Sequence, residues 1–219
     1  MDCPAATVFC DFDGTVTSID TFDAVVSAAT PQLWAELKQQ LFNFEINLRQ
    51  GMQALADGLT PEDLERMVAH MGQYAPRPCF LPFLAELERA GLPFVLVSGG
   101  LVPLVEAVLG PHRHRLDQLI AAEVLPHPQG GLRFHSPFAN DQELVAKAEV
   151  VKRYGRGLCV VIGDSITDLG MAEVADVVFA REPLSGWLEQ RGILFHYWDS
   201  FADVEAVLRQ QGLLPAAAA

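Results

Sequence analysis

The chain has 219 residues, half of them hydrophobic and a fifth charged, which is the composition of an ordered globular protein rather than a disordered one. Acidic residues outnumber basic ones by 28 to 15, and the net charge of −13 at pH 7 disfavours nucleic acid and anionic membranes as partners. No C-x-x-C pair occurs and no stretch reaches the ~18 apolar residues of a membrane span, so we expect a cytoplasmic protein with reduced thiols.

The first predicted element is a buried strand over residues 7–10, which ends at Asp11. Asp11 and Asp13 are two positions apart, so their carboxylates project in different directions. One can then act as a nucleophile while the other handles a proton. The segment also begins like a calcium-binding loop, but Gly14 stands at the fourth position instead of the sixth. Taken alone, this acidic strand end is equally compatible with a solvated loop.

Residues 16–78 lose the strand pattern and carry helix signals instead. Thr30-Pro31 is typical of a helix start, and Thr60 with Asp63 forms a capping-box pattern. Helices are predicted over residues 32–41, 47–56 and 61–71. We expect these helices to form a cap domain over residues 16–78, hinged near Arg77-Pro78. A discontinuous α/β catalytic core would then comprise residues 1–15 and 79–219.

The second half of the chain alternates between strands and helices, which indicates a parallel α/β sheet. Strands are predicted over residues 93–97, 158–162, 177–180 and 194–198, a hairpin over 122–126 and 132–136, and helices over 83–90, 101–109, 142–154 and 201–210. Ligands of such sheets bind beyond the carboxyl ends of the strands. We therefore expect the polar segments that follow the strands at 7–10, 93–97 and 158–162 to converge on one site.

Two of these segments have the chemistry of a phosphate and metal site. Ser98 and Gly99 supply a hydroxyl and open backbone N–H groups before a helix, which suits an anion, although an ordinary tight turn has the same composition. Asp164 and Asp168 add a second acidic cluster, and carboxylate oxygens are the ligands that Mg²⁺ prefers.

This arrangement resembles the haloacid dehalogenase superfamily of phosphatases, whose four motifs occur here in order. They are Asp11-Phe-Asp13-Gly-Thr15, Ser98 after its strand, a lysine before the strand at 158–162, and Gly163-Asp164 with Asp168. The resemblance implies a Rossmann-like core, with Asp11 attacking phosphorus and Asp13 as general acid and base. It also implies Mg²⁺ bound by Asp11, Asp164 and the backbone carbonyl of Asp13, with Asp168 supporting these ligands.

The motif lysine is predicted to be Lys147, which would bind phosphate together with Ser98 and Gly99. Lys147 starts the helix that leads into the strand at 158–162, whereas Lys152 lies five positions further, about 500° around a helix. The two lysines therefore cannot share a face, and Lys152 is expected to be solvated.

The helical insertion is similar to the cap of phosphoserine phosphatases. Asp20 stands where those enzymes carry a substrate-facing glutamate, but Gly51 stands where they carry an arginine for the serine carboxylate. Glycine cannot replace a guanidinium. Arg49 lies two positions before Gly51 and is the nearest arginine to take over the carboxylate, but at this spacing it points to another side of the helix. Thr167 also replaces their usual asparagine, so phosphoserine is disfavoured, with Asp20 and Arg49 as candidate substrate contacts.

A closer resemblance is to the 2-hydroxy-3-keto-5-methylthiopentenyl-1-phosphate phosphatases of methionine salvage. It is carried by Cys10-Asp-Phe-Asp-Gly-Thr-Val-Thr17, Arg49-Gln-Gly51-Met, Val97-Ser-Gly-Gly100, Ile162-Gly-Asp-Ser-Ile-Thr-Asp168 and Phe179-Ala-Arg181. An apolar cap pocket would suit their thioether substrate. The stretch 135–142 departs from the family, some of whose members carry a cysteine cluster there.

Several alternatives stay open at this point. A phosphoserine phosphatase, another small-metabolite phosphatase or a phosphotransferase would share these motifs, and a phosphate-binding protein would share the fold. A phospho-receiver switch also phosphorylates an aspartate, but it has no cap inserted after its first strand. The expected ligand is a small phosphorylated metabolite, without nucleic acid or membrane, and we leave open that the chain forms a homodimer.

Overall fold

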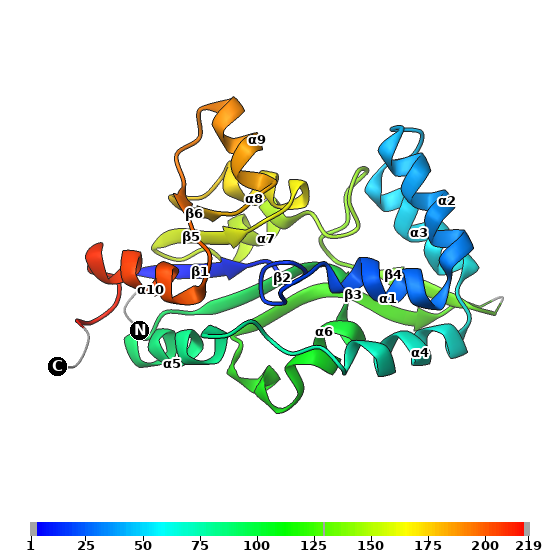
Figure 1. Ribbon diagram of the computed structural model, residues 1–219, viewed down its shortest axis with the longest axis horizontal. Coiled ribbons are helices and arrows are strands. Elements are labelled where there is room, and N and C mark those ends of the chain that lie inside the picture. The colour runs from blue at the N-terminus through cyan, green and yellow to red at the C-terminus, as the bar shows by residue number, and fades with distance from the viewer. Residues whose placement is uncertain (1–3, 129, 217–219) are drawn as a thin grey trace.

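The computed structural model describes residues 4–128 and 130–216, in which seven strands form one mixed sheet (Figure 1). The strands are β1 (Ala6–Cys10), β2 (Phe94–Leu101), β3 (Gln118–Pro126), β4 (Leu132–His135), β5 (Leu158–Gly163), β6 (Val177–Ala180) and β7 (His196–Tyr197). Across the sheet they follow the order β4-β3-β2-β1-β5-β6-β7. The pair β3–β4 is antiparallel and every other neighbouring pair is parallel.

Helices lie on both faces of the sheet, as the alternating pattern predicts. They are α1 (Thr21–Ala29), α2 (Pro31–Phe42), α3 (Leu48–Gly58), α4 (Pro61–Met71), α5 (Phe80–Ala90), α6 (Val102–Leu109), α7 (Lys147–Tyr154), α8 (Leu169–Ala172), α9 (Leu184–Arg191) and α10 (Phe201–Gln210), with 3-10 turns η1 (Gly110–Arg115) and η2 (Ile166–Asp168). In Figure 1, α5 and α6 lie below the sheet and α7 and α8 above it. The predicted α/β core is confirmed.

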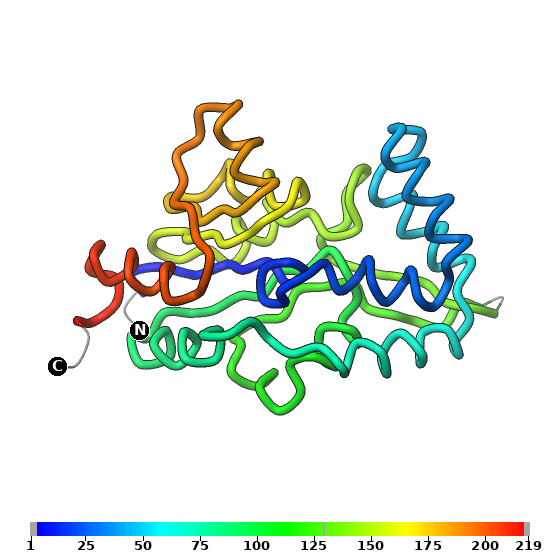
Figure 2. The backbone as a smooth tube through the Cα atoms, in the orientation of Figure 1, coloured from blue at the N-terminus to red at the C-terminus, as the bar shows by residue number. Residues whose placement is uncertain are grey.

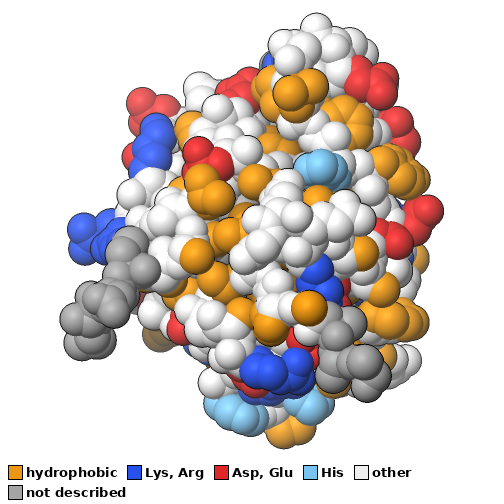
Figure 3. Space-filling view, turned by 90° about the vertical axis from the view of Figure 1, so that its left-hand side faces the viewer, with side chains coloured by type: hydrophobic (Ala, Val, Ile, Leu, Met, Phe, Trp, Pro, Cys, Tyr) orange, Lys and Arg blue, Asp and Glu red, His pale blue; other side chains and the backbone are white. Residues whose placement is uncertain are grey.

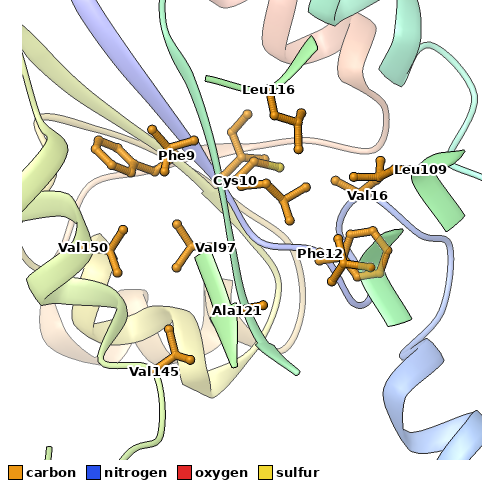
Figure 4. Close-up of a cluster of buried hydrophobic side chains, with 14 of the residues drawn as sticks. Phe9, Cys10, Phe12, Val16, Val97, Leu109, Leu116, Ala121, Val145 and Val150 are labelled. Atoms are coloured by element: carbon orange, nitrogen blue, oxygen red, sulfur yellow. The ribbon is translucent and has the colours of Figure 1, made fainter. Parts of the chain in front are cut away.

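Strand β1 lies at the centre of the sheet. It pairs with β2 on one side and β5 on the other, and all five of its side chains are buried. Figure 4 shows part of the buried cluster around its carboxyl end, including Phe9, Cys10 and Phe12. A strand that is covered on both faces requires a run of apolar residues, which explains why residues 7–10 are recognisable in the sequence.

An all-helical segment follows β1, in agreement with the sequence prediction. Figure 2 shows the chain leaving the sheet after β1, passing through α1 to α4 and returning to α5. Helix α1 contacts α4, α2 contacts α3, α4 contacts α6 and α3 contacts β4. The buried residues of this helical segment, among them Val25, Trp34 and Met67, belong to the same apolar cluster as the buried residues of the sheet. The helices between residues 16 and 78 are therefore packed onto the core.

Local capping explains where α3 and α4 begin. Thr60 and Asp63 form the predicted capping box at α4, and Asn47 with Gln50 forms another at α3. Thr30 occupies the predicted cap position before α2, but its hydroxyl donates to the carbonyl of Val26 instead of capping.

Several predicted boundaries are wrong: the helix at 83–90 begins at Phe80, the strand at 122–126 begins at Gln118, and the strand at 194–198 is limited to His196–Tyr197. Two further differences bear on the site. The helix expected over residues 142–154 begins only at Lys147, because Asn140 accepts the backbone N–H groups of Gln142 and Glu143 and holds this stretch in a turn. Strand β2 continues to Leu101 and therefore includes the Ser98-Gly-Gly segment, with a register shift against β3 after Val97.

No helix in the described ranges combines the length and apolar character needed to cross a membrane. On the left-hand face of the molecule, shown in Figure 3, acidic and basic side chains are interspersed with hydrophobic ones.

Candidate active site

Three strand ends meet at the carboxyl edge of the sheet, and each carries a predicted site residue. Asp11 follows β1, Ser98 lies near the end of β2, and Asp164 follows β5. The backbone N–H of Asp11 donates to the carbonyl of Ile162 at 2.9 Å, which joins the ends of β1 and β5. The parallel pairing of the central strands thus brings together side chains that lie up to about 150 residues apart in the sequence.

Lys147 is the cation at the base of this site. It is the first residue of α7, and its Nζ donates to Asp11 and, at 2.6 Å, to Oδ1 of Asp168. All three side chains are buried. Burial lowers the pKa of Lys147, but the charges of Asp11 and Asp168 outweigh it and hold the pKa above its usual range, so the ammonium stays charged. Lys152 is exposed and pairs with Glu149 at 2.7 Å.

The carboxylate of Asp168 is fully engaged within the protein. Its Oδ1 accepts from Lys147, and its Oδ2 accepts the backbone N–H groups of Asp164 at 3.0 Å and Ser165 at 2.9 Å. Asp168 therefore fixes both the lysine and the loop that carries Asp164.

Asp11, Asp164 and Asp168 form an acidic cluster that fits a divalent cation. One oxygen from each lies within 4.8 Å of the other two. Asp11 and Asp164 accept from Lys147 and Thr15 through one oxygen each, which leaves a second oxygen for a metal ion. With all three carboxylates ionised against one buried ammonium, the cluster has an excess of two negative charges. Burial raises the pKa of Asp11 and raises that of Asp164 to about 6, as expected where positive charge is lacking.

Gly14 lets the loop after β1 approach Asp164 closely. Its φ is +81°, and a Cβ atom there would lie 2.3 Å from Oδ2 of Asp164. The hydroxyl of the next residue, Thr15, donates to Oδ1 of Asp164 at 2.7 Å. Sequence reasoning missed this role of Thr15, although the residue belongs to the first motif.

Asp13 is held by the start of α1. Its Oδ1 accepts from the hydroxyl of Thr21 and, at 2.9 Å, from the backbone N–H of Phe22, while the Ser98 hydroxyl lies 3.5 Å from its Oδ2. Burial raises the pKa of Asp13 to about 6, against the opposing effect of these hydrogen bonds. Such a carboxyl can both give and take a proton near neutral pH. Thr21 was not singled out from the sequence, and its only signal is its place after Asp20, which caps α1.

The Ser98-Gly99-Gly100 segment presents its backbone to the same site. Ser98 is buried, and its hydroxyl accepts the backbone N–H of Gly100 at 2.9 Å. A Cβ atom on Gly99 would meet nothing within 4 Å, whereas one on Gly100 would lie 3.1 Å from the ring of Phe22. A side chain at Gly100 would therefore crowd Phe22, while Gly99 lines open space.

A pocket of about 320 Å³ lies above these residues, between the sheet edge and the first three helices. Asp11, Asp13, Gly99, Lys147 and Asp164 are among its lining residues. The apolar part of its lining consists of Phe22, Trp34, Leu41, Leu48, Met52, Leu144 and Val145. The pocket therefore combines a charged base with a wall that is mostly apolar and also carries Asp20, Asp23, Lys38 and Glu143.

The two candidate substrate contacts of the helical segment differ in position. Asp20 lines the pocket. Arg49 is not among the lining residues, and its guanidinium donates to the carbonyl of Asn140 on the loop before Lys147. Gly51 does line the pocket, and a Cβ atom there would lie 3.2 Å from Leu41. Leu41 thus lies against the position that an arginine would need.

Comparisons with known proteins agree with this geometry. The family model described as haloacid dehalogenase-like hydrolase matches residues 8–173. The 2-hydroxy-3-keto-5-methylthiopentenyl-1-phosphate phosphatase of Microcystis aeruginosa is 36% identical over 203 residues, covering 92% of this chain and 96% of that protein. The protein of the same name from Brevibacillus brevis is 29% identical, with 93% of this chain and 95% of the relative covered.

Solved structures show the same fold. A phosphoserine phosphatase from T. onnurineus superposes with a TM-score of 0.70 at 18% identity, covering 95% of this chain and 98% of the other. A phospho-aspartyl intermediate analogue of phosphoserine phosphatase gives a TM-score of 0.69 at 19% identity, covering 94% and 99%.

Proposed function

This chain belongs to the haloacid dehalogenase-like hydrolase family, and from that premise we propose that it is a Mg²⁺-dependent phosphatase of a small metabolite, with Asp11 as its nucleophile. Its curated relatives are named phosphatases, and the chain is a phosphoric monoester hydrolase. The observation that carries the assignment of Asp11 is the buried contact between this carboxylate and Lys147 at the base of the pocket.

In the proposed reaction, Asp11 attacks phosphorus in line with the leaving oxygen and becomes an aspartyl phosphate. Asp13 donates a proton to the leaving oxygen and then takes one from the water that releases phosphate. Its pKa of about 6 supports both roles, because the carboxyl exchanges a proton readily near neutral pH. The hydrogen bonds from α1 hold Asp13 in place between the two steps.

Lys147, Ser98 and Gly99 are proposed to bind the phosphoryl oxygens. The lysine already lies against Asp11, so it offsets the repulsion between the carboxylate and an incoming phosphate. A bound Mg²⁺ would supply further positive charge, and Asp11, Asp164 and the carbonyl of Asp13 are its proposed ligands. Asp168 supports them through Lys147 and the backbone of Asp164.

For the substrate, we propose 2-hydroxy-3-keto-5-methylthiopentenyl-1-phosphate, the compound named in the curated relatives. Its phosphate would lie over Asp11, and its methylthio end would extend along the apolar wall that includes Trp34, Leu41 and Met52. A thioether carries no charge and gains from contact with apolar and aromatic side chains.

Phosphoserine is the second candidate, because phosphoserine phosphatases are among the similar solved structures. Its carboxylate needs a cationic partner, and Gly51 and Leu41 offer none, while Lys38, the lysine on the pocket wall, is already paired with Asp23 at 2.7 Å. Asp20 and Arg49 remain proposed substrate contacts. Asp20 lines the pocket, whereas Arg49 would have to break its hydrogen bond to the carbonyl of Asn140 to reach a substrate.

A phosphotransferase would use the same residues with an alcohol in place of water, and analysis of the products distinguishes it.

We further propose that residues 16–78 act as a cap domain on a core formed by residues 1–15 and 79–219. The position of the pocket between these helices and the sheet edge supports this division. Action on a small metabolite is the basis for proposing that the enzyme works in the cytoplasm. A homodimer is compatible with this proposal.

The substrate assignment is tested by measuring phosphate release by the purified chain in MgCl₂. The methylthiopentenyl phosphate and phosphoserine are compared, with Asp11→Asn as the inactive control. We expect kcat/KM to favour the first substrate by a factor on the order of 100, because the phosphoserine carboxylate would meet a mostly apolar wall whose lysine, Lys38, is already paired with Asp23. A preference for phosphoserine would overturn the substrate assignment and leave the phosphatase assignment standing.

A further inference from the structure

Arg77 binds the loop that follows the proposed nucleophile. The residue lies between α4 and α5, where the chain returns to the core. Its Nε donates to the carbonyl of Thr15 at 3.1 Å, and its Nη2 donates to the carbonyls of Gly14 at 2.8 Å and Thr17 at 3.1 Å. Its backbone N–H adds a bond to the carbonyl of Val16 at 2.6 Å. One residue thus holds four consecutive carbonyl groups.

The guanidinium of Arg77 also lies over the ring of Trp198, which is buried. The central guanidinium carbon of Arg77 lies 5.6 Å from the ring centroid of Trp198. The indole N–H of Trp198 donates to the carbonyl of Gly163 at 3.4 Å, one residue before Asp164. Arg77 therefore lies between two loops, one after β1 and one after β5. These loops carry Asp13 and Asp164, respectively.

Two residues of the loop that Arg77 binds are themselves in contact with Asp164. Thr15, whose carbonyl binds Arg77, donates its hydroxyl to Oδ1 of Asp164 at 2.7 Å. Gly14, whose carbonyl also binds Arg77, lies so close to Asp164 that a Cβ atom would approach Oδ2 to 2.3 Å. A shift of the loop would therefore move the carboxylate of Asp164.

We propose that Arg77 is a positioning residue for the metal site, which holds Asp164 in the orientation that binds Mg²⁺. The inference rests on the proposed function, because it takes Asp164 as a Mg²⁺ ligand. Arginine suits the role because its planar guanidinium directs several N–H groups at fixed angles while its face stacks on an aromatic ring. Lysine has no such plane, so it would satisfy fewer of these carbonyls.

Arg181 provides a matched control. Its guanidinium carbon lies 5.2 Å from the centroid of the same Trp198 ring, but its side chain donates to the carbonyl of Asp199 and not to the loop at 14–17. Arg181→Ala therefore removes an arginine from the same ring and leaves the loop contacts in place.

The test measures Mg²⁺ binding to the full chain by titration calorimetry with MgCl₂ alone, without substrate. Arg77→Ala, Arg77→Lys and Arg181→Ala are compared with the wild type, and thermal melting without Mg²⁺ reports folding. We expect Arg77→Ala to weaken Mg²⁺ binding about 10- to 100-fold, the range for residues that orient metal ligands. Arg77→Lys should show a smaller loss, and it carries the test if Arg77→Ala fails to fold. Arg181→Ala should bind Mg²⁺ like the wild type.

A purely structural role would lower the melting temperature without changing Mg²⁺ affinity. Folded Arg77 variants that bind Mg²⁺ as tightly as the wild type would overturn the inference and leave the proposed function standing. If the wild type itself binds no Mg²⁺, the metal assignment of the proposed function fails as well. High MgCl₂ should restore much of the kcat of Arg77→Lys if the defect is one of metal binding.

Discussion

Asp11 and Asp168 share one buried cation, and single substitutions at this contact give the sharpest tests of the site. Removing the ammonium with Lys147→Met would leave both buried carboxylates without a cationic partner. Without metal, we expect the free energy of unfolding to fall by about 3 kcal/mol, because an unpaired buried charge is strongly unfavourable. Urea unfolding in EDTA measures the change.

Lys152→Met is the control for this substitution. Its ion pair with Glu149 has more than half of each side chain exposed, so we expect a change within about 1 kcal/mol. Equal effects of the two substitutions would contradict the buried ion pair.

Gly14 allows a second test at the residue scale, because its Cβ would collide with a proposed metal ligand. In Gly14→Ala we expect kcat/KM to fall about 100-fold, the size of effect that follows from moving a reacting group by about 1 Å. Gly91→Ala is the control, since Gly91 also has a positive φ but a Cβ there meets nothing within 4 Å. It should lose about 1 kcal/mol of stability and keep its activity. An active Gly14→Ala enzyme would refute the close approach of the loop to Asp164.

At the scale of elements, the capping box of α4 is a local device whose effect can be measured. Thr60→Ala removes the side-chain oxygen that accepts the N–H of Asp63, and we expect a loss of about 1 kcal/mol in urea unfolding. Thr30→Ala should cost less than about 0.5 kcal/mol, because Thr30 makes no capping hydrogen bond to α2. The reverse order would contradict the capping assignments.

The ionisation of Asp63, at the start of the same helix, makes the free energy of unfolding depend on pH. The backbone N–H and hydroxyl of Thr60 lower the pKa of Asp63 in the folded chain. A carboxyl with a lowered folded pKa stabilises the protein above its unfolded pKa of about 4, and this contribution is lost as the pH falls through the folded value. Asp63→Asn should therefore be less stable than the wild type at pH 7, and the difference should shrink below about pH 4. A gap that stays constant with pH would rule out this linkage.

The sequence predicts the elements best where a single local rule decides them. The strands at 158–162 and 177–180 and the helix at 201–210 are found almost as predicted, because apolar runs and capping residues define them. The helix over 142–154 was predicted too long, because the side chain of Asn140 competes locally for backbone N–H groups. A pattern of apolar residues does not reveal such a turn.

In the candidate site too, local sequence predicts some residues, whereas other contacts depend on how distant segments pack together. Asp11, Asp164 and Ser98 can be placed from sequence because each lies at or near a strand end, where parallel strands deliver side chains to one edge. The contacts of Arg77 with the loop at 14–17 span about 60 residues and depend on how the helical segment returns to the core. No local pattern in the sequence contains that information.

At the scale of the whole molecule, the proposed cap and core share one apolar cluster. Leu55 and Met67 from the helical segment belong to it together with Phe9 and Leu104 from the core. We therefore expect one cooperative thermal transition in calorimetry, with calorimetric and van't Hoff enthalpies in agreement. Two resolved transitions, or an excised segment 16–78 that folds alone, would show that the two parts are independent.

The central claim is that Asp11 receives the phosphoryl group during catalysis. The most direct measurement is to quench the enzyme with acid during turnover of the methylthiopentenyl phosphate in MgCl₂ and to locate phosphate on the chain by mass spectrometry of its peptides. The account predicts phosphorylation of the peptide that contains Asp11 and none in Asp11→Asn. Phosphate on another residue, or turnover by Asp11→Asn at the wild-type rate, would contradict it.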